Sequence, residues 1–183
     1  YGLKLMAWGF FKKIVVADTL AVYVNNVYGN LSSHTGLSLI IASVFFAFQI
    51  YCDFSGYSDI AIGVSKLLGI DLMQNFRSPY FSGSVKEFWS RWHISLSTWF
   101  RDYVYIPLGG NRNGKIATVR NLLIVWLLTG LWHGAGYNFV LWGTVLFIII
   151  MLEKFFIGKY LNKMPVIAHL YMFILIPITW AIF

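Results

Sequence analysis

Charged residues are scarce in this sequence. Asp, Glu, Lys and Arg make up 11% of its 183 residues, whereas about a quarter is usual in a soluble domain. Hydrophobic residues make up 58%, and aromatic residues, which gather at membrane interfaces, make up 19%. Because several apolar runs approach the length that crosses a bilayer, this composition excludes a single soluble α/β domain and predicts an integral membrane protein.

Cysteine and several well-known catalytic motifs are also missing or nearly so. Cys52 is the single cysteine, so the chain has neither an internal disulfide nor a cysteine-rich metal site. It lacks the G-x-S-x-G turn of serine hydrolases and the H-E-x-x-H zinc motif. Gly109 to Lys115 matches the spacing of a phosphate loop, but Ile116 stands where that loop needs Ser or Thr. We therefore reject nucleotide hydrolysis and expect no metal and no bound cofactor.

The sequence does carry basic charge, and it lies between the apolar runs. The net charge is +7, but the lysines and arginines separate apolar segments, which indicates cytoplasmic loops and lipid head groups and not nucleic acid. We expect a multi-pass protein of the cytoplasmic (inner) membrane. Helical patterning begins at Tyr1, and an apolar run continues to Phe183. We therefore treat residues 1–183 as one domain that is truncated at both ends.

The apolar periodicity predicts an all-α transmembrane bundle with short interfacial or re-entrant helices. The expected helices cover residues 1–28, 36–51, 59–69, 84–103, 122–132, 139–152 and 165–183. A break is expected at Gly56, with Asp59 capping the helix that follows. The segment 84–103 is expected to form one amphipathic helix, whose apolar side chains share a sector about 120° wide.

Two places in the chain are candidates for chemistry. Asp53 ends the second apolar run, and an acidic residue at membrane depth is by default a functional candidate. The run Gly130-Leu-Trp-His-Gly-Ala-Gly136 places one imidazole, His133, at the turn of an expected hairpin. Each arm of that hairpin is shorter than the ~20 residues of a full span, which draws the turn into the membrane.

A neutral imidazole at that depth supports more than one kind of chemistry. Burial disfavours the charged form, so His133 can accept a proton from a hydroxyl as a general base. A proton path through Asp53, His93 and His133 in a transporter needs the same residue types. The glycines around His133 admit either a substrate or a closely packed helix. A scaffold that docks a partner through the Trp-rich helix is a third class, and the residues alone leave all three open.

Four ordered blocks of this sequence resemble the membrane-bound O-acyltransferase family. The blocks are Tyr51 to Gly63, Asn75 to Tyr80, Glu87 to Ser97 and Leu131 to Ala135. The run Asp102 to Arg112, which contains Pro-Leu-Gly-Gly-Asn-Arg, is similar to the alginate O-acetyltransferase branch of that family. The related D-alanyl transfer proteins of teichoic acid usually lack it. The resemblance covers nearly the whole chain.

The resemblance implies a site and a reaction. It implies that His133 is the catalytic histidine and that His93 is the second histidine of the site, in a helical bundle whose funnels meet near them. The donor would be a cytoplasmic thioester, with acetyl-CoA as co-substrate, and an extracytoplasmic partner protein would complete O-acetylation of a polysaccharide. D-alanyl or other acyl transfer to a cell-wall polymer is the alternative. As further substrate-binding candidates we name Asp53, Trp92, Trp132 and Asn138.

Overall fold

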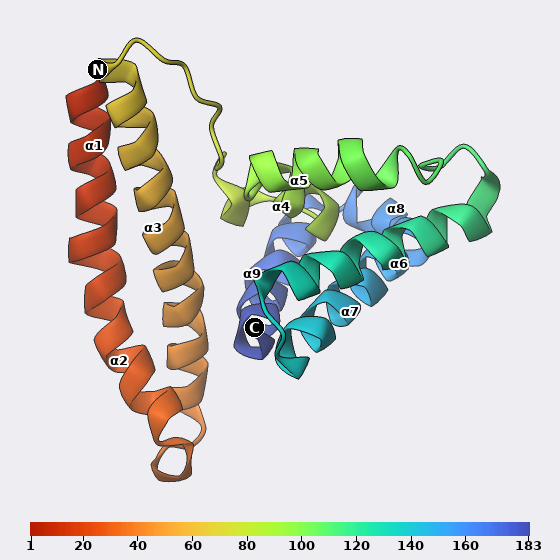
Figure 1. Ribbon diagram of the computed structural model, residues 1–183. Helices are drawn as coiled ribbons and strands as arrows, with labels where there is room; N and C mark the ends of the chain where they lie inside the picture. The colour runs from red at the N-terminus through yellow and green to blue at the C-terminus, as the bar shows by residue number, and fades with distance from the viewer. The chain divides into compact units, whose positions relative to one another are not determined.

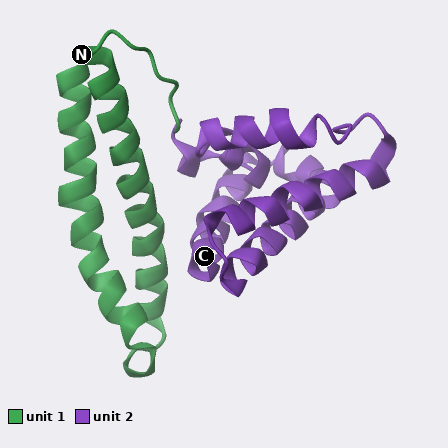
Figure 2. Cartoon of the chain, in the orientation of Figure 1, with its two compact units in different colours: residues 1–75 green, residues 76–183 purple.

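The computed structural model describes residues 1–183 and consists of helices, turns and one isolated β-bridge. The chain divides into two compact units, Tyr1–Asn75 and Phe76–Phe183 (Figure 2). Four helices are long and apolar enough to cross a membrane: Leu37–Leu67, Gly114–His133, Tyr137–Leu161 and Pro165–Ile182. The predicted all-α membrane class is confirmed, and the expectation of a single domain stays a prediction.

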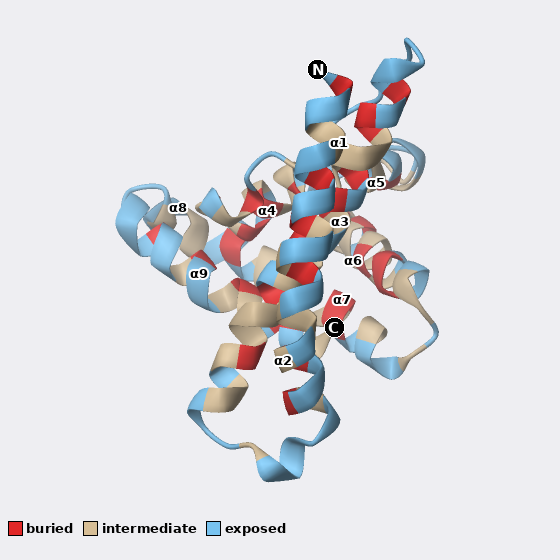
Figure 3. Cartoon of the chain, turned by 90° about the vertical axis from the view of Figure 1, so that its left-hand side faces the viewer, coloured by how far each residue is buried: buried red, intermediate tan, exposed pale blue.

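The first unit is a pair of long helical segments that run side by side (Figure 1). In the first segment a π-helical turn, Phe11–Ala17, joins α1 (Gly2–Phe10) to α2 (Asp18–Gly29). The second segment is α3 (Leu37–Leu67), which returns antiparallel to the first. The outer faces of both segments are largely exposed (Figure 3). Many of their exposed residues are large and apolar, which suits contact with lipid.

Helix α3 continues through Gly56, so the break expected there is wrong. A Cβ atom built on Gly56 would lie 2.7 Å from the carbonyl oxygen of Gly9, and one built on Gly9 would lie 2.6 Å from the carbonyl oxygen of Gly56. Two helical turns away, Gly2 and Gly63 face each other in the same manner. These glycines therefore mark close helix packing, as small residues do at membrane helix interfaces.

Asp59 lies in the middle of α3, so its expected role as a helix cap is also wrong. Its carboxylate Oδ2 lies 2.7 Å from the Nζ atom of Lys12, which also donates a hydrogen bond to Ser55 at 3.0 Å. Lys13 pairs with Asp53 at 2.8 Å. An acidic residue in the middle of a buried helix face can be tolerated because it is paired.

The second unit contains six α-helices: α4 (Val85–Arg91), α5 (Ile94–Phe100), α6 (Gly114–His133), α7 (Tyr137–Leu152), α8 (Gly158–Leu161) and α9 (Pro165–Ile182). π-helical turns follow α5 at Arg101–Tyr105 and α7 at Glu153–Ile157. Because the second of these turns joins α7 to α8, one continuous helix covers Tyr137–Leu161.

The segment 84–103 is not one amphipathic helix, and that prediction is wrong. Helix α4 ends at Arg91, and α5 starts at Ile94. Between them Trp92 is extended and forms the antiparallel bridge to Phe76, while His93 has a left-handed backbone with φ 44°. A left-handed residue stops helical hydrogen bonding, which a side-chain periodicity cannot reveal.

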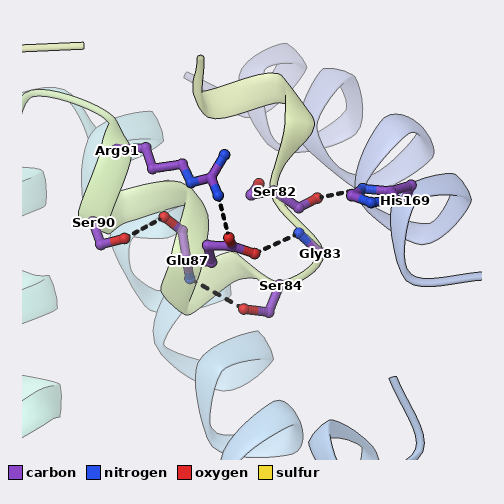
Figure 4. Close-up of polar contacts among 7 residues, drawn as sticks. All are labelled: Ser82, Gly83, Ser84, Glu87, Ser90, Arg91 and His169. Atoms are coloured by element: carbon purple, nitrogen blue, oxygen red, sulfur yellow. Dashed lines mark hydrogen bonds and ion pairs between the residues drawn. The ribbon is translucent and has the colours of Figure 1, made fainter. Parts of the chain in front are cut away.

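The start of α4 is held by side chains that satisfy its free N–H groups (Figure 4). Ser84 accepts a hydrogen bond from the Glu87 N–H at 3.1 Å, and the Glu87 carboxylate accepts one from the Gly83 N–H at 2.8 Å. The other oxygen of Glu87 pairs with Arg91 at 2.5 Å. This short helix is therefore capped by its own sequence.

Helices α6 and α7 form an antiparallel hairpin whose contact is set by glycine. A Cβ atom on Gly130 would meet the carbonyl oxygen of Phe139, and one on Gly143 would meet that of Trp126. The two backbones can approach this closely only because both positions lack a side chain. At Gly130, close helix packing is therefore the role that the structure shows.

The arms of this hairpin are longer than the sequence suggested. They cover 20 and 25 residues, and each is long enough to cross a bilayer. Helix α6 begins at Gly114, eight positions before the expected start at Leu122, so the basic turn residues Lys115 and Arg120 are helical. The expectation of short arms is wrong, and with it the argument that draws the turn into the membrane.

Aromatic side chains fill the core of the second unit. The Trp142 ring stacks on Trp180 with centroids 5.8 Å apart and meets Trp89 at 5.6 Å. Trp92 lies 5.0 Å from Trp180 and 5.4 Å from Phe88. Helices α4, α7 and α9 each contribute rings to this cluster. The ring contacts therefore hold these three helices together.

Candidate active site

His93 occupies the kink between α4 and α5. Its left-handed conformation is uncommon for a residue with a side chain and stores strain, which persists where surrounding structure imposes it. The Arg77 N–H donates to the Arg91 carbonyl at 3.0 Å, which helps to hold the kink in place. The His93 ring lies 5.8 Å from the Trp132 ring.

His133 is the last residue of α6, at the turn into α7. Its imidazole is surrounded by rings: the centroid distances are 4.8 Å to Phe183, 4.9 Å to Trp132 and 5.3 Å to Trp142. Phe139 lies 6.3 Å away in a stacked orientation. The end of α6 thus places the His133 imidazole among aromatic side chains.

Both histidines line one cavity of about 210 Å³ within the second unit. Its wall is formed by α4, α5, the turn after α5, and α6. The lining residues are Trp89, Trp92, His93, Leu96, Ser97, Phe100, Arg101, Tyr105, Leu122, Val125, Trp126, Thr129 and His133. A mostly aromatic and aliphatic wall with a few polar groups is typical of a pocket for a small organic group.

Burial keeps the second histidine uncharged at neutral pH. Desolvation, with a smaller contribution from nearby His133, lowers the pKa of His93 from 6.5 to about 4. The serine and threonine hydroxyls in the cavity wall already donate hydrogen bonds, Thr129 to the Val125 carbonyl at 2.8 Å and Ser97 to the Trp89 carbonyl at 3.1 Å. The two imidazoles are therefore the groups in this wall best suited to accept a proton.

Arg101 and Tyr105 are two wall residues that sequence reasoning did not single out. Arg101 lies in the π-helical turn after α5 and forms an ion pair with Asp102 at 2.7 Å, which raises the pKa of the guanidinium. Burial raises the pKa of the Tyr105 hydroxyl. The signal in the sequence was the run Asp102 to Arg112 that resembles the alginate branch, which contains Tyr105 and directly follows Arg101.

The other substrate-binding candidates differ in where they lie. Trp92 is 4% exposed and contributes to both the aromatic core and the cavity wall. Trp132 is 57% exposed, and its ring contacts both histidines. The Asn138 amide donates to the Phe183 carbonyl at 2.6 Å. Asp53 belongs to the Tyr1–Asn75 unit, where it pairs with Lys13. Substrate contact by these four residues stays a prediction.

Glu153 is a further residue that the sequence did not single out, although it shapes the segment that carries His93. Glu153 is 6% exposed, and its carboxylate accepts hydrogen bonds from the Val85 N–H at 2.8 and 3.0 Å and from the Lys86 N–H at 3.4 Å. The hydroxyl of Tyr171 also hydrogen-bonds to it. The signal available was a lone acidic residue at the end of a strongly apolar run.

These observations place two histidines in an aromatic cavity inside a membrane-type helical protein. A family model for the membrane-bound O-acyltransferases matches residues 3–178. The chain belongs to this family. The predicted resemblance is confirmed, and the match extends across both units of the structure.

Relatives within and near this family are named for acyl transfer to polymers. The chain is 48% identical over 179 residues to a probable alginate O-acetylase of Pseudomonas syringae, covering 96% of this chain and 34% of that protein. It is 39% identical to a peptidoglycan O-acetyltransferase of Helicobacter pylori, covering 100% and 35%. It is 30% identical to a teichoic acid D-alanyltransferase of Bacillus subtilis, covering 85% and 41%.

The chain spans about a third of the length of the first of these curated relatives. The likeness to several alginate O-acetylases, at 43–48% identity, is greater than the likeness to the D-alanyltransferases. This agrees with the branch that the Pro-Leu-Gly-Gly-Asn-Arg run predicts.

Proposed function

We propose that the full protein is an O-acetyltransferase of the cytoplasmic membrane that serves an extracytoplasmic polysaccharide. The observation that carries the proposal is the shared cavity, whose wall includes both His133 and His93. The relatives named as O-acetylases support acetyl as the acyl group. The donor is a cytoplasmic thioester, acetyl-CoA, and an extracytoplasmic partner protein takes part in delivering the acetyl group to the polymer.

In this proposal His133 acts as the general base. Its ring nitrogen accepts the proton of the acceptor hydroxyl while the oxygen attacks the carbonyl carbon of the thioester. A carbon–oxygen bond forms, the carbon–sulfur bond breaks, and the proton passes from the imidazolium to the departing thiolate. The aromatic wall excludes water that would otherwise hydrolyse the thioester.

His93 serves in this scheme as the second imidazole of the cavity. Because its pKa is lowered to about 4, it stays neutral and adds no positive charge that would hinder protonation of His133. It is therefore suited to orient the acceptor or the thioester by hydrogen bonding. A weaker effect of its removal is expected than for the base itself.

The test is acetyl transfer by the full protein with single histidine variants. His133→Ala should lower turnover by roughly 10²–10⁴-fold, as loss of a general base does. His34→Ala, in the loop before α3, is the matched control and should leave turnover unchanged. Normal turnover in His133→Ala protein that is expressed and folded as usual would overturn the assignment of the base.

D-alanyl transfer is the second candidate, because a teichoic acid D-alanyltransferase is 30% identical over most of this chain. The two candidates share the thioester chemistry and differ in the acyl group. Supplying the full protein with acetyl and D-alanyl thioesters in parallel decides between them. Preferential use of the D-alanyl donor would replace the acetyl assignment.

A further inference from the structure

A second cavity of about 940 Å³ opens beside the histidine cavity in the same unit. The two cavities share Tyr105 and Leu122 as wall residues, so they adjoin at the turn after α5 and along α6. Most residues in the wall of the second cavity have polar side chains, and three of them are lysines, Lys86, Lys154 and Lys159. It therefore differs from the aromatic histidine cavity in the ligands that it suits.

The acidic residues of this second cavity are already engaged by other groups. Glu153 accepts its hydrogen bonds from the backbone N–H groups of Val85 and Lys86. Glu87 is held by the Gly83 N–H and by Arg91. Neither carboxylate forms an ion pair with a lysine of the cavity wall.

The three lysines are left without an acidic partner. None of them forms an ion pair with a carboxylate of the chain. The ammonium group of Lys159 lies 4.8 Å from the centre of the Tyr160 ring, a contact that does not cancel its charge. The wall carries three lysines against two carboxylates, one of which is already paired with Arg91. This excess of positive charge favours a multiply charged anion.

We infer that this lysine-lined cavity binds the phosphate groups of the acyl donor, while the thioester end of the same molecule enters the histidine cavity. The inference rests on the proposed function. Lysine ammonium groups bind phosphate as point charges. Basic residues lie at the start of α6 and after the end of α7, and they indicate the cytoplasmic side of the membrane. A phosphorylated thioester arriving from the cytoplasm thus meets the lysines before it meets His133.

The test compares two donors of the same acetyl group. Acetyl-CoA carries phosphates, whereas the acetyl thioester of N-acetylcysteamine carries none. With the full protein in phosphatidylcholine nanodiscs, Lys86→Ala and Lys154→Ala should each raise KM for acetyl-CoA roughly 10-fold, which corresponds to about 1.4 kcal/mol. The same variants should leave KM for the phosphate-free thioester unchanged.

Two further variants separate binding from folding. Lys163→Ala removes a lysine that lies just after α8 and outside the cavity wall, and it should leave both KM values unchanged. Lys154→Arg keeps the charge and should restore most of the acetyl-CoA affinity. Equal losses for both donors, or no loss for acetyl-CoA in the alanine variants, would overturn the inference.

Failure of the proposed function gives a different pattern. If the unmodified protein transfers acetyl from neither donor, equilibrium binding of CoA itself still tests the cavity. Binding that weakens in the lysine variants then supports the phosphate site, and binding that is absent or unaffected overturns it.

An anionic lipid head group offers the same phosphate chemistry from another source. Adding phosphatidylglycerol to the nanodiscs distinguishes the two. If phosphatidylglycerol competes with CoA only in protein that keeps its lysines, and activity requires that lipid, the occupant is the head group and the donor assignment is overturned. Insensitivity of the acetyl-CoA KM to the lipid supports the donor.

Discussion

The two units of this protein handle charge in opposite ways. In the Tyr1–Asn75 unit, Lys12 and Lys13 are each paired with a carboxylate, and glycines bring the helix backbones together. In the Phe76–Phe183 unit, indole and phenyl rings form the core, and three cavity lysines have no acidic partner. Charges that pair between two helices stabilise the helix pair, whereas lysines without an ion-pair partner around a cavity remain available to a ligand.

The largest expected effect is on the buried ion pair of the first unit. Lys12→Ala leaves Asp59 as an unpaired charge in the helix interface, which should lower the free energy of unfolding by about 3–5 kcal/mol. Thermal unfolding of the full protein in detergent measures it. In the double variant Lys12→Ala/Asp59→Asn the charge is gone, so most of the stability should return; no recovery would contradict the pairing as the cause.

Loss of Glu153 should have a smaller effect, in the second unit. Glu153→Ala leaves the buried N–H of Val85 and the partly buried N–H of Lys86 without this acceptor, which should cost about 1–3 kcal/mol of stability. Glu153→Gln keeps one carbonyl acceptor and should retain more. Because α4 ends at the His93 kink, the alanine variant should also reduce turnover. Equal stability of both variants would show that the hydrogen bonds are not the relevant contribution.

The pH response of the second unit should be smaller again, because the His93 ring is only partly buried. Its folded pKa of about 4 lies below its ordinary 6.5, so the unfolded chain takes up the proton first. The stability from neutral His93 is present above pH 6.5 and decreases as the pH falls toward 4. His93→Gln should flatten this part of the curve of melting temperature against pH; an unchanged slope would contradict it.

The exposed ion pair of the first unit gives the smallest expected effect. Lys13 and Asp53 have side chains that are 42% and 52% exposed. Solvent screens such a pair, so Lys13→Ala should change stability by less than about 1 kcal/mol. Measuring this variant beside Lys12→Ala at low and high salt sharpens the contrast. A loss as large as that of Lys12→Ala would show that exposure does not distinguish the pairs.

The apolar pattern alone predicted most of the fold. Long apolar runs place the membrane helices because a helix satisfies its own backbone hydrogen bonds in lipid and presents apolar side chains to the lipid. The ends of the helices were harder to predict from the sequence. Gly56 reads as a break in a single chain, yet it lies inside α3 because Gly9 of another helix approaches it. Such a contact depends on a partner that is remote in the sequence.

The kink at His93 shows a second limit of pattern reading. Apolar spacing continues across the segment 84–103, but a single left-handed residue separates α4 from α5. Backbone conformation at one residue leaves no trace in periodicity. For the site, the family resemblance named both histidines that line the cavity, whereas Arg101 and Tyr105 joined them only through the turn that follows α5.

The contact between Glu153 and the start of α4 also bears on the order in which the protein folds during synthesis. Val85 precedes Glu153 by 68 residues, so it leaves the ribosome well before the carboxylate that receives its N–H. Until the second arm of the hairpin has been translated and inserted, α4 has only its local caps. The segment that carries His93 therefore reaches its final arrangement late, after the membrane hairpin that completes it.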